Sequence, residues 1–357
     1  MPSPYPWHYT LRWPLYFYRP SIWNRTRIGT RPLEHSFFPH EDDAPLRLLF
    51  LGDIMSLHGD RISRLDPALT KLLSEADLVI GNCEAPVMRR PLSPVSRNGF
   101  VFNMSHEYLR GIVEQFEVKP GRLMLSVANN HTFDQGEAGY VSTQECFAEL
   151  GIQPLGLWNG GTSPISRVEV RGMAVGVAAW TQWMNIEPER ADPGVWRQSH
   201  VKDLDAEELK RRHALDLVVA FPHWEYEFQH FPHPSTREFA RHLNARQFKL
   251  IVGCHPHVVQ PMEWFDGGLC AYSIGNFCGL GVAWSVKLVS LLEVRVGTQG
   301  EFRGKVVGYR LHPFIQYHEG ERISLLPLDK TPAVQRSAWE QRLGLVYAPP
   351  QQRSQAA

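Results

Sequence analysis

Short apolar runs alternate with amphipathic stretches along most of the chain. Runs bounded by glycine, proline or polar residues predict buried β-strands over residues 46–51, 78–80, 123–127, 215–221, 250–252 and 268–273. Apolar residues at helical spacing predict helices over residues 67–75, 107–116, 136–150, 206–213 and 234–248. Asp66 is expected to cap the first helix, and Gly151 to end the third. Strands that alternate with helices indicate an α/β fold.

The pattern beyond these elements favours antiparallel strands and one main domain. A hairpin is predicted to turn at Arg171-Gly172, and two more strands are predicted over residues 286–296 and 304–311. Neither an internal repeat nor a linker interrupts the pattern between Leu46 and Leu326, so we expect one domain over residues 45–326. Residues 327–357 form a polar C-terminal tail, which is expected to lack fixed structure from about Thr331.

Residues 1–44 form an N-terminal arm of unusual composition. The arm is rich in tryptophan, tyrosine and arginine, and its first acidic residue is Glu34. Frequent prolines oppose a long helix, and the arm lacks the continuous apolar core of a signal peptide. Two interpretations remain open: the arm lies over the body or a partner subunit, or it contacts a membrane surface through its arginine and aromatic side chains.

Side chains that can bind a metal or take part in catalysis follow five of the predicted strands. They are Asp53, Glu84, Asn130 with His131, His223, and His255 with His257. Ligands gather at the carboxyl ends of strands in α/β folds. Taken singly, Asp53 could cap a helix, Glu84 could pair with Arg89 or Arg90, and His223 could be a core histidine. Taken together, the carboxylates, amide and imidazoles predict a site for one or two divalent ions, of Mn, Fe, Zn or Mg.

Composition restricts the partners and the compartment. The 357-residue chain carries 37 acidic and 37 basic residues, so no net charge favours nucleic acid as a partner. Its five cysteines are an odd number, widely spaced and mostly inside apolar runs, which is typical of free thiols in a reducing compartment. We therefore expect a cytoplasmic protein, either free or peripheral to the membrane.

Six short motifs resemble those of the CapA-like family of poly-gamma-glutamate capsule biosynthesis proteins, a branch of the calcineurin-like metallophosphoesterase superfamily. The motifs are Gly52-Asp-Ile-Met55, Gly81-Asn-Cys-Glu84, Ala128-Asn-Asn-His-Thr-Phe-Asp-Gln-Gly136, His223-Trp-Glu-Tyr-Glu227, Gly253-Cys-His-Pro-His-Val258 and Tyr272-Ser-Ile-Gly-Asn-Phe277. The resemblance covers roughly residues 46–320. It implies a four-layer α/β/β/α sandwich of two mixed sheets flanked by helices, with a metal centre at one edge.

The resemblance also implies metal-ligand roles. Asp53, Glu84 and His257 would hold a first ion, and Asn130, His223 and His255 a second, with Glu84 as a bridge. Met55 stands where ordinary phosphoesterases carry a histidine, which leaves open whether one or two ions bind.

Other roles concern catalysis and the rim of the site. His131 occupies the place of the general acid, and Asp134 would either orient His131 or cap the following helix. Asn276 is expected at the rim. Glu225 stands where the family usually has glycine, and would alter substrate access or add a ligand.

The expected function is that of a metal-dependent hydrolase. Through a metal-activated water it would act on a phosphoester, or on a γ-glutamyl or other cell-envelope polymer. The alternative is a non-catalytic accessory subunit of a polyglutamate or capsule polymer synthesis or export complex, with capsule-synthesis proteins as its partners.

Overall fold

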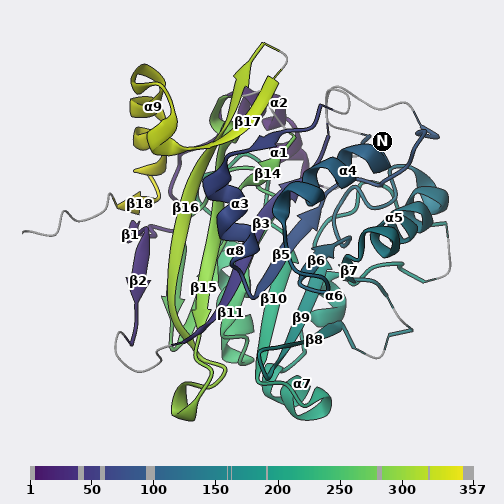
Figure 1. The fold of residues 1–357 in the computed structure, drawn as a ribbon, viewed down its shortest axis with the longest axis vertical. Helices are drawn as coiled ribbons and strands as arrows, with labels where there is room; N and C mark the ends of the chain where they lie inside the picture. The colour runs from purple at the N-terminus through teal and green to yellow at the C-terminus, as the bar shows by residue number, and fades with distance from the viewer. Residues whose placement is uncertain are drawn as a thin grey trace, which may run out of the picture.

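The chain folds into four packed layers, with two β-sheets between two layers of helices (Figure 1). The computed structural model describes residues 5–38, 44–56, 61–93, 101–158, 160–161, 163–189, 192–279, 284–320 and 322–348. The prediction of a four-layer α/β/β/α sandwich with two mixed sheets is confirmed.

The larger sheet contains ten strands and is mixed. Its main order is β4-β17-β16-β15-β3-β5-β6-β7, with β14 beside β3 and β2 beside β16. The strands are β2 (Glu34–Ser36), β3 (Leu46–Ile54), β4 (Arg64–Leu65), β5 (Leu78–Cys83), β6 (Leu123–Ser126), β7 (Gln153–Leu155), β14 (Asn276–Cys278), β15 (Leu288–Val296), β16 (Val306–Glu319) and β17 (Arg322–Pro327). Strands β3, β5, β6 and β7 run parallel, so the ends of the first three point the same way.

The smaller sheet contains six strands in the order β12-β13-β11-β10-β9-β8. They are β8 (Ile165–Val170), β9 (Met173–Thr181), β10 (Leu217–His223), β11 (Leu250–Val252), β12 (Met262–Phe265) and β13 (Gly268–Ala271). Strands β9, β10, β11 and β13 are parallel, and the two edge strands are antiparallel to their neighbours.

Helices cover the outer face of each sheet. The main ones are α3 (Pro67–Ser74), α4 (His106–Val113) and α5 (Gly136–Leu150) on the larger sheet, and α6 (Gln198–Val201), α7 (Ala206–His213) and α8 (Pro234–Ala245) on the smaller. Strand β3 shows why the layers form: Leu49 and Leu51 pack against α3–α5, while Leu48 and Phe50 pack between the sheets. Successive side chains of a strand point to opposite faces, so a continuous apolar strand serves two cores.

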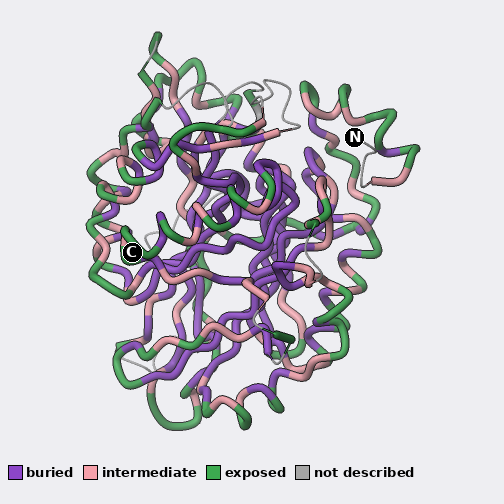
Figure 2. The backbone as a smooth tube through the Cα atoms, turned by 90° about the vertical axis from the view of Figure 1, so that its right-hand side faces the viewer, coloured by how far each residue is buried: buried purple, intermediate pink, exposed green. Residues whose placement is uncertain are grey.

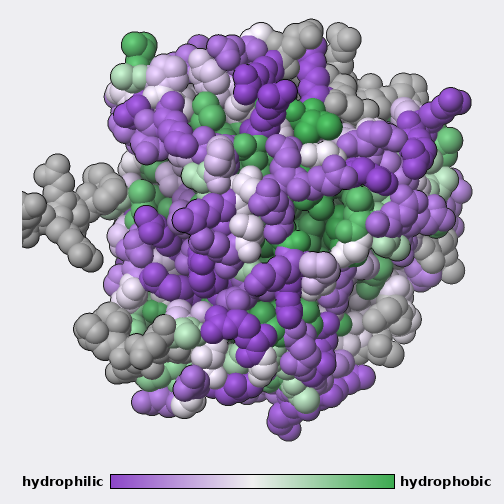
Figure 3. Space-filling view, viewed as in Figure 1, coloured by the Kyte–Doolittle hydropathy of each residue, from purple (hydrophilic) through white to green (hydrophobic). Residues whose placement is uncertain are grey.

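Buried residues concentrate in the strands at the middle of the molecule (Figure 2). The face seen in Figure 3 is largely hydrophilic, and its hydrophobic side chains form separate patches. Within the described residues, no helix has both the length and the apolar composition needed to cross a bilayer. All five cysteines are buried and free, as the sequence predicted.

The C-terminal segment differs from the prediction. Helix α9 (Ala333–Leu343) buries Trp339 and Leu343 against the core, and β18 (Tyr347–Ala348) pairs with β1 (Arg31–Pro32). The expectation of a tail without fixed structure from Thr331 is therefore wrong up to Ala348. Residues 349–357 of the predicted tail lie outside the described residues, as do residues 1–4 and 39–43 of the predicted arm.

The N-terminal arm packs on the body of the protein. It forms two short helices, α1 (Trp7–Thr10) and α2 (Trp13–Tyr18), as expected from its prolines. Trp13 and Phe17 contact the ring of Phe228, with centroids 5.7 and 5.3 Å away. Tyr9 is buried. The inner side of the arm thus reaches the segment that follows β10.

Candidate metal centre

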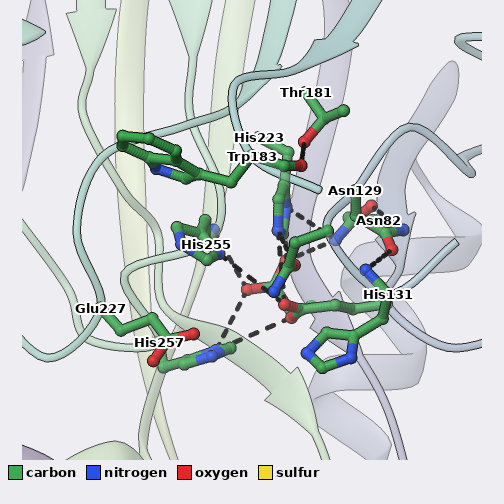
Figure 4. A network of polar contacts seen from close by, with 12 residues as sticks. Asn82, Asn129, His131, Thr181, Trp183, His223, Glu227, His255 and His257 are labelled. Carbon is green, nitrogen blue, oxygen red and sulfur yellow. Dashed lines mark hydrogen bonds and ion pairs between the residues drawn. The ribbon is translucent and has the colours of Figure 1, made fainter. Parts of the chain in front are cut away.

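The ends of β3, β5 and β6 in one sheet meet the ends of β10 and β11 in the other. Within the larger sheet, beside this meeting point, two backbones approach closely: a Cβ atom on Gly52 would lie 1.7 Å from the carbonyl oxygen of Gly275. Only glycine fits at position 52, and β14 can therefore pair with β3 so that Asn276 is opposite Asp53. The sheet edges bring every predicted metal-ligand residue into one buried cluster, whose three histidines are labelled in Figure 4.

Two sets of candidate ligands share Glu84. The first set is Asp53, Glu84 and His257, and the second is Glu84, His223 and His255. Within each set the ligand atoms lie within 4.8 Å of one another. Glu84 Oε1 is 3.3 Å from His223 Nε2, and Glu84 Oε2 is 3.7 Å from His257 Nδ1. The two oxygens of one carboxylate therefore face different sets.

Buried polar atoms in the cluster fit a cation. Both oxygens of Glu84 and Nδ1 of His255 have no hydrogen-bond partner among the described residues. Asn130 Oδ1 is 2.9 Å from His223 Nε2, which places Asn130 at the second set. Burying an ionised carboxylate without hydrogen bonds costs on the order of several kcal/mol of folding free energy, because the charge loses its hydration. Divalent ions bound to these oxygen and nitrogen donors would remove that cost.

The pKa shifts in the cluster also favour a bound cation. Burial raises the pKa of the Glu84 carboxyl well above its usual range, and the charge of Asp53 raises it further. Burial lowers the pKa of His223 to about 3, so its imidazole is neutral and can act as a ligand. Burial opposes ionisation of Asp53, but the hydrogen bond and the positive charge of His257 hold the pKa of Asp53 below its usual value. A nearby cation is the partner that would stabilise ionised Glu84.

Asparagines fix the positions of the ligands. Asn82 Nδ2 donates to Asp53 Oδ1 at 2.7 Å and lies 3.2 Å from His223 Nδ1. Asn129 Nδ2 donates to the carbonyl oxygen of Cys83, and its Oδ1 accepts from the backbone N–H of His131. Neither asparagine was among the site residues predicted from the sequence. Asn82 lies in β5, two residues before Glu84, so the two side chains point to the same side of the sheet, and this spacing could have identified Asn82.

His131 lies beside the cluster, on the other side of the carboxylates from His255 (Figure 4). Its Nδ1 is 2.6 Å from Asp134 Oδ2, and its ring stacks on Phe102 with centroids 3.7 Å apart. Asp134 also accepts from the backbone N–H of Phe102, while Gln135 is the N-cap of α5. The geometry therefore places Asp134 as the residue that orients His131, and not as the helix cap.

The structure places Glu225 and Asn276 differently from the expectation. The carboxylate of Glu225 accepts from the backbone N–H of His233 at the start of α8, so Glu225 is directed to that helix and not to the ligand cluster. Asn276 is fully buried rather than at a rim, and its Oδ1 is 2.9 Å from His257 Nδ1. Asn276 thus orients a candidate ligand. Met55 packs in the core beneath α3–α5, where its carbonyl accepts from Tyr108.

The histidine pair has a strained backbone. His255 and His257 have φ angles of 101° and 59°, in a region that side-chain-bearing residues rarely adopt. Such conformations cost about 1–3 kcal/mol each and persist where the surrounding structure imposes them. Here the strain turns both imidazoles inward from the end of β11 (Figure 4).

The two packed mixed sheets and the carboxylate shared by two ligand sets define an α/β/β/α protein with a candidate metal centre between its sheets. The chain belongs to the family described as bacterial capsule synthesis protein PGA_cap, whose model matches residues 47–279. The predicted CapA-like resemblance is confirmed. The chain is 26 % identical over 250 residues to the PGA biosynthesis protein CapA of Bacillus subtilis (strain 168), and 25 % identical over 256 residues to the capsule biosynthesis protein CapA of Bacillus anthracis.

Each match covers 67 % of this chain but only 64 % and 61 % of the two relatives. Among solved structures, a novel phosphatase from Mycoplasma pneumoniae is 14 % identical, with a TM-score of 0.49 over 76 % of this chain and 94 % of that one. A 5'-nucleotidase precursor from Thermus thermophilus is also 14 % identical, with a TM-score of 0.46 over 84 % of this chain and 58 % of that one.

Proposed function

We propose that this chain is a hydrolase that uses two divalent metal ions to cleave a phosphoester, or a γ-glutamyl amide of a cell-envelope polymer. The observation that supports this most strongly is the pair of ligand sets joined by Glu84, with His131 beside them. Two ions held by a common carboxylate are suited to hydrolytic chemistry. The superfamily favours a phosphoester, and the names of the two CapA relatives favour a polyglutamate substrate.

The residues divide into ligands and a proton donor. Asp53, Glu84 and His257 would hold one ion; Asn130, His223 and His255 would complete the second with Glu84. When bound, the ions would supply an activated water and polarise the scissile group. His131 would give a proton to the leaving group: Asp134 holds Nδ1 at 2.6 Å, and Nε2, which has a 3.5 Å contact with Asn185 Nδ2, would face the substrate. Its stacking on Phe102 would hold the ring in that orientation.

Metal content and turnover test this proposal together. Purified protein reconstituted with Mn²⁺ or Zn²⁺ should contain about two ions per chain and hydrolyse bis(p-nitrophenyl) phosphate or a γ-glutamyl anilide. Glu84→Ala should lose both ions, because it removes the shared ligand. Glu169→Ala is a matched control, because this exposed acid on β8 pairs with Arg167 away from the cluster.

Less than ~0.2 ion per chain after reconstitution, with no turnover of either probe, would contradict the proposal. A protein that retains its ions but hydrolyses neither probe would instead support the accessory-subunit alternative.

A further inference from the structure

The N-terminal arm reaches the outer side of His255 through Tyr5. The Tyr5 hydroxyl donates to Glu227 Oε1 at 2.9 Å and lies 2.9 Å from His255 Nε2. Because a phenol carries one proton and gives it to Glu227, its contact with His255 is one in which Nε2–H donates to the hydroxyl. The three groups form a chain of hydrogen bonds that runs from His255 through Tyr5 to the carboxylate of Glu227.

This chain of hydrogen bonds determines which imidazole nitrogen faces the cluster. With the proton on Nε2, the lone pair of His255 is on Nδ1, which is the buried atom without a hydrogen-bond partner. Nδ1 is also the atom that faces Glu84, 3.9 Å from Oε1. The tautomer that the Tyr5 contact selects is therefore the one a metal ligand requires.

The rest of the arm holds the carboxylate of Glu227 in place. Trp13 Nε1 donates to Glu227 Oε2, and the Tyr9 hydroxyl donates to the backbone carbonyl of Glu227. Glu227 itself is buried and lies near His257 (Figure 4). Residues of the arm thus supply three hydrogen bonds to Glu227, although the arm lies outside residues 47–279 that the family model covers.

We propose that Tyr5 is a positioning residue of the metal centre, which fixes the tautomer and orientation of His255 through its relay to Glu227. This inference rests on the proposed function and adds a residue from the arm to the site. Partners that hold the far nitrogen of a metal-bound histidine typically change metal affinity by about 10- to 100-fold.

Cobalt titration of the full-length protein tests the relay. Tyr5→Phe keeps the ring but removes the hydroxyl, and should weaken binding of one of the cobalt ions by about 10- to 100-fold and alter its visible absorption bands. Tyr9→Phe is the matched control, because its hydroxyl reaches only the backbone of Glu227; its cobalt affinity should stay within about threefold of wild type. Circular dichroism checks that both variants fold.

The outcomes separate the relay from the proposed function. Wild-type protein that binds no cobalt would contradict the proposed function and the relay together. Cobalt binding and spectra that are unchanged in Tyr5→Phe would contradict the relay alone. An equal loss of cobalt affinity in Tyr5→Phe and Tyr9→Phe would show that the arm affects the site only by packing on it, and would also contradict the relay.

The outer side of the arm carries a second, independent feature. Trp7, Leu11, Leu15, Tyr18, Ile22 and Trp23 are between 56 and 75 % exposed. The first four follow each other at intervals of three or four residues, along α1, the turn that follows it and α2. Arginines 12, 19, 25 and 27 are exposed beside them, and the sequence has no acidic residue before Glu34.

We also propose that this outer face docks on an anionic lipid surface. Exposed tryptophan, tyrosine and leucine next to arginines match the boundary between the headgroups and acyl chains of a bilayer. The absence of acidic side chains on this stretch of sequence complements the negative charge of anionic lipids. A protein partner would not account for the combination of basic and aromatic residues as directly.

Vesicle flotation tests the lipid surface. Wild-type protein should float with phosphatidylcholine vesicles that contain phosphatidylglycerol, and much less with phosphatidylcholine alone. A triple variant of the arm, Trp7→Ser/Leu11→Ser/Leu15→Ser, should reduce flotation by about tenfold or more. Leu92→Ser/Val141→Ser/Val334→Ser is the matched control, because these apolar side chains are exposed elsewhere, and it should float like wild type.

Flotation that does not depend on the three arm residues, or no flotation of wild type, would contradict lipid docking. Another outcome is that wild-type protein self-associates without lipid and that the arm variant loses this association. That result would assign the face to a second copy of the chain, and it would also contradict lipid docking.

Discussion

Glu84 joins the two halves of the candidate centre because its two oxygens face different histidines. Oε1 lies 3.3 Å from His223 Nε2, and Oε2 lies 3.7 Å from His257 Nδ1. The sequence allowed this residue to be a surface partner of Arg89 or Arg90. In the structure Glu84 is fully buried and Arg89 pairs with Glu107, so burial decides between the two interpretations.

His131 provides a prediction at the scale of one residue. His131→Ala should lower kcat by roughly 100-fold or more on whichever probe the wild type hydrolyses, because a general acid is removed. Metal content should stay at the wild-type level, since His131 belongs to neither ligand set. Steady-state kinetics with elemental analysis measures both, and a variant with wild-type kcat would remove His131 from the mechanism.

At the scale of residues, the sequence indicated which side chains lie together where they stand near the end of an apolar strand. Asp53, His223 and His257 could be expected in one cluster because the ends of parallel strands meet at one edge of a sheet, and the structure buries all three there. Their roles as metal ligands stay a prediction. Glu225 could not be placed, because its positive φ of 80° turns it toward α8, and nothing in the sequence indicates that turn. Tyr5 could not be found either, since it is 250 residues from His255 and its contact depends on the path of the arm.

Strands β3 and β14 provide a prediction at the scale of elements. Gly52→Ala should lower the free energy of unfolding by about 3 kcal/mol, because the new methyl group would overlap the Gly275 carbonyl and force the two strands apart. Gly29→Ala is the matched control, since a Cβ there meets no atom within 4 Å, and it should change stability by less than about 0.5 kcal/mol. Urea unfolding measures both. Equal stability of the two variants would show that this close approach is not required.

Strand β15 provides a prediction about pH. The imidazole of His312, with Nε2 3.5 Å from Glu293 Oε2, and the hydrogen bond from Arg47 lower the pKa of Glu293 to about 2, against the effect of burial. A carboxyl group with a depressed pKa in the folded state stabilises the fold above its unfolded pKa, and this contribution is lost as pH falls toward the folded pKa. Glu293→Gln should therefore lower the free energy of unfolding by about 1 kcal/mol at pH 6.

The difference between Glu293→Gln and wild type should shrink as the pH falls from about 4.5 to about 2. Urea unfolding at several pH values measures this difference. A difference that stays constant over this range would mean that ionisation of Glu293 contributes nothing to stability.

Element-level prediction from sequence worked best for central strands and long helices. Strands β3, β5 and β6 are continuous apolar runs because both of their faces are buried, and α5 coincides with the predicted helix. Helix α9 was missed because most of its residues are polar and only Trp339 and Leu343 are buried. Short edge strands such as β7, which contains Pro154, carry too little pattern to be recognised.

At the scale of the whole molecule, the arm links the candidate centre to the surface. Its inner side reaches His255 through Tyr5, and its outer side exposes Trp7, Leu11 and Leu15. A bound membrane surface and an ordered metal ligand would then depend on the same short segment. The sequence shows that the arm is aromatic and basic but leaves its position open. Segments with many prolines lack a periodic pattern that would indicate where they pack.

The central claim is that Glu84 bridges two metal ions. Anomalous diffraction from crystals soaked in Mn²⁺ tests this most directly. We expect two peaks about 3.5–4 Å apart, one beside Asp53 and His257 and the other beside His223 and His255, with Glu84 between them. No peak in contact with Glu84, or a single peak that contacts only one set of ligands, would contradict the claim.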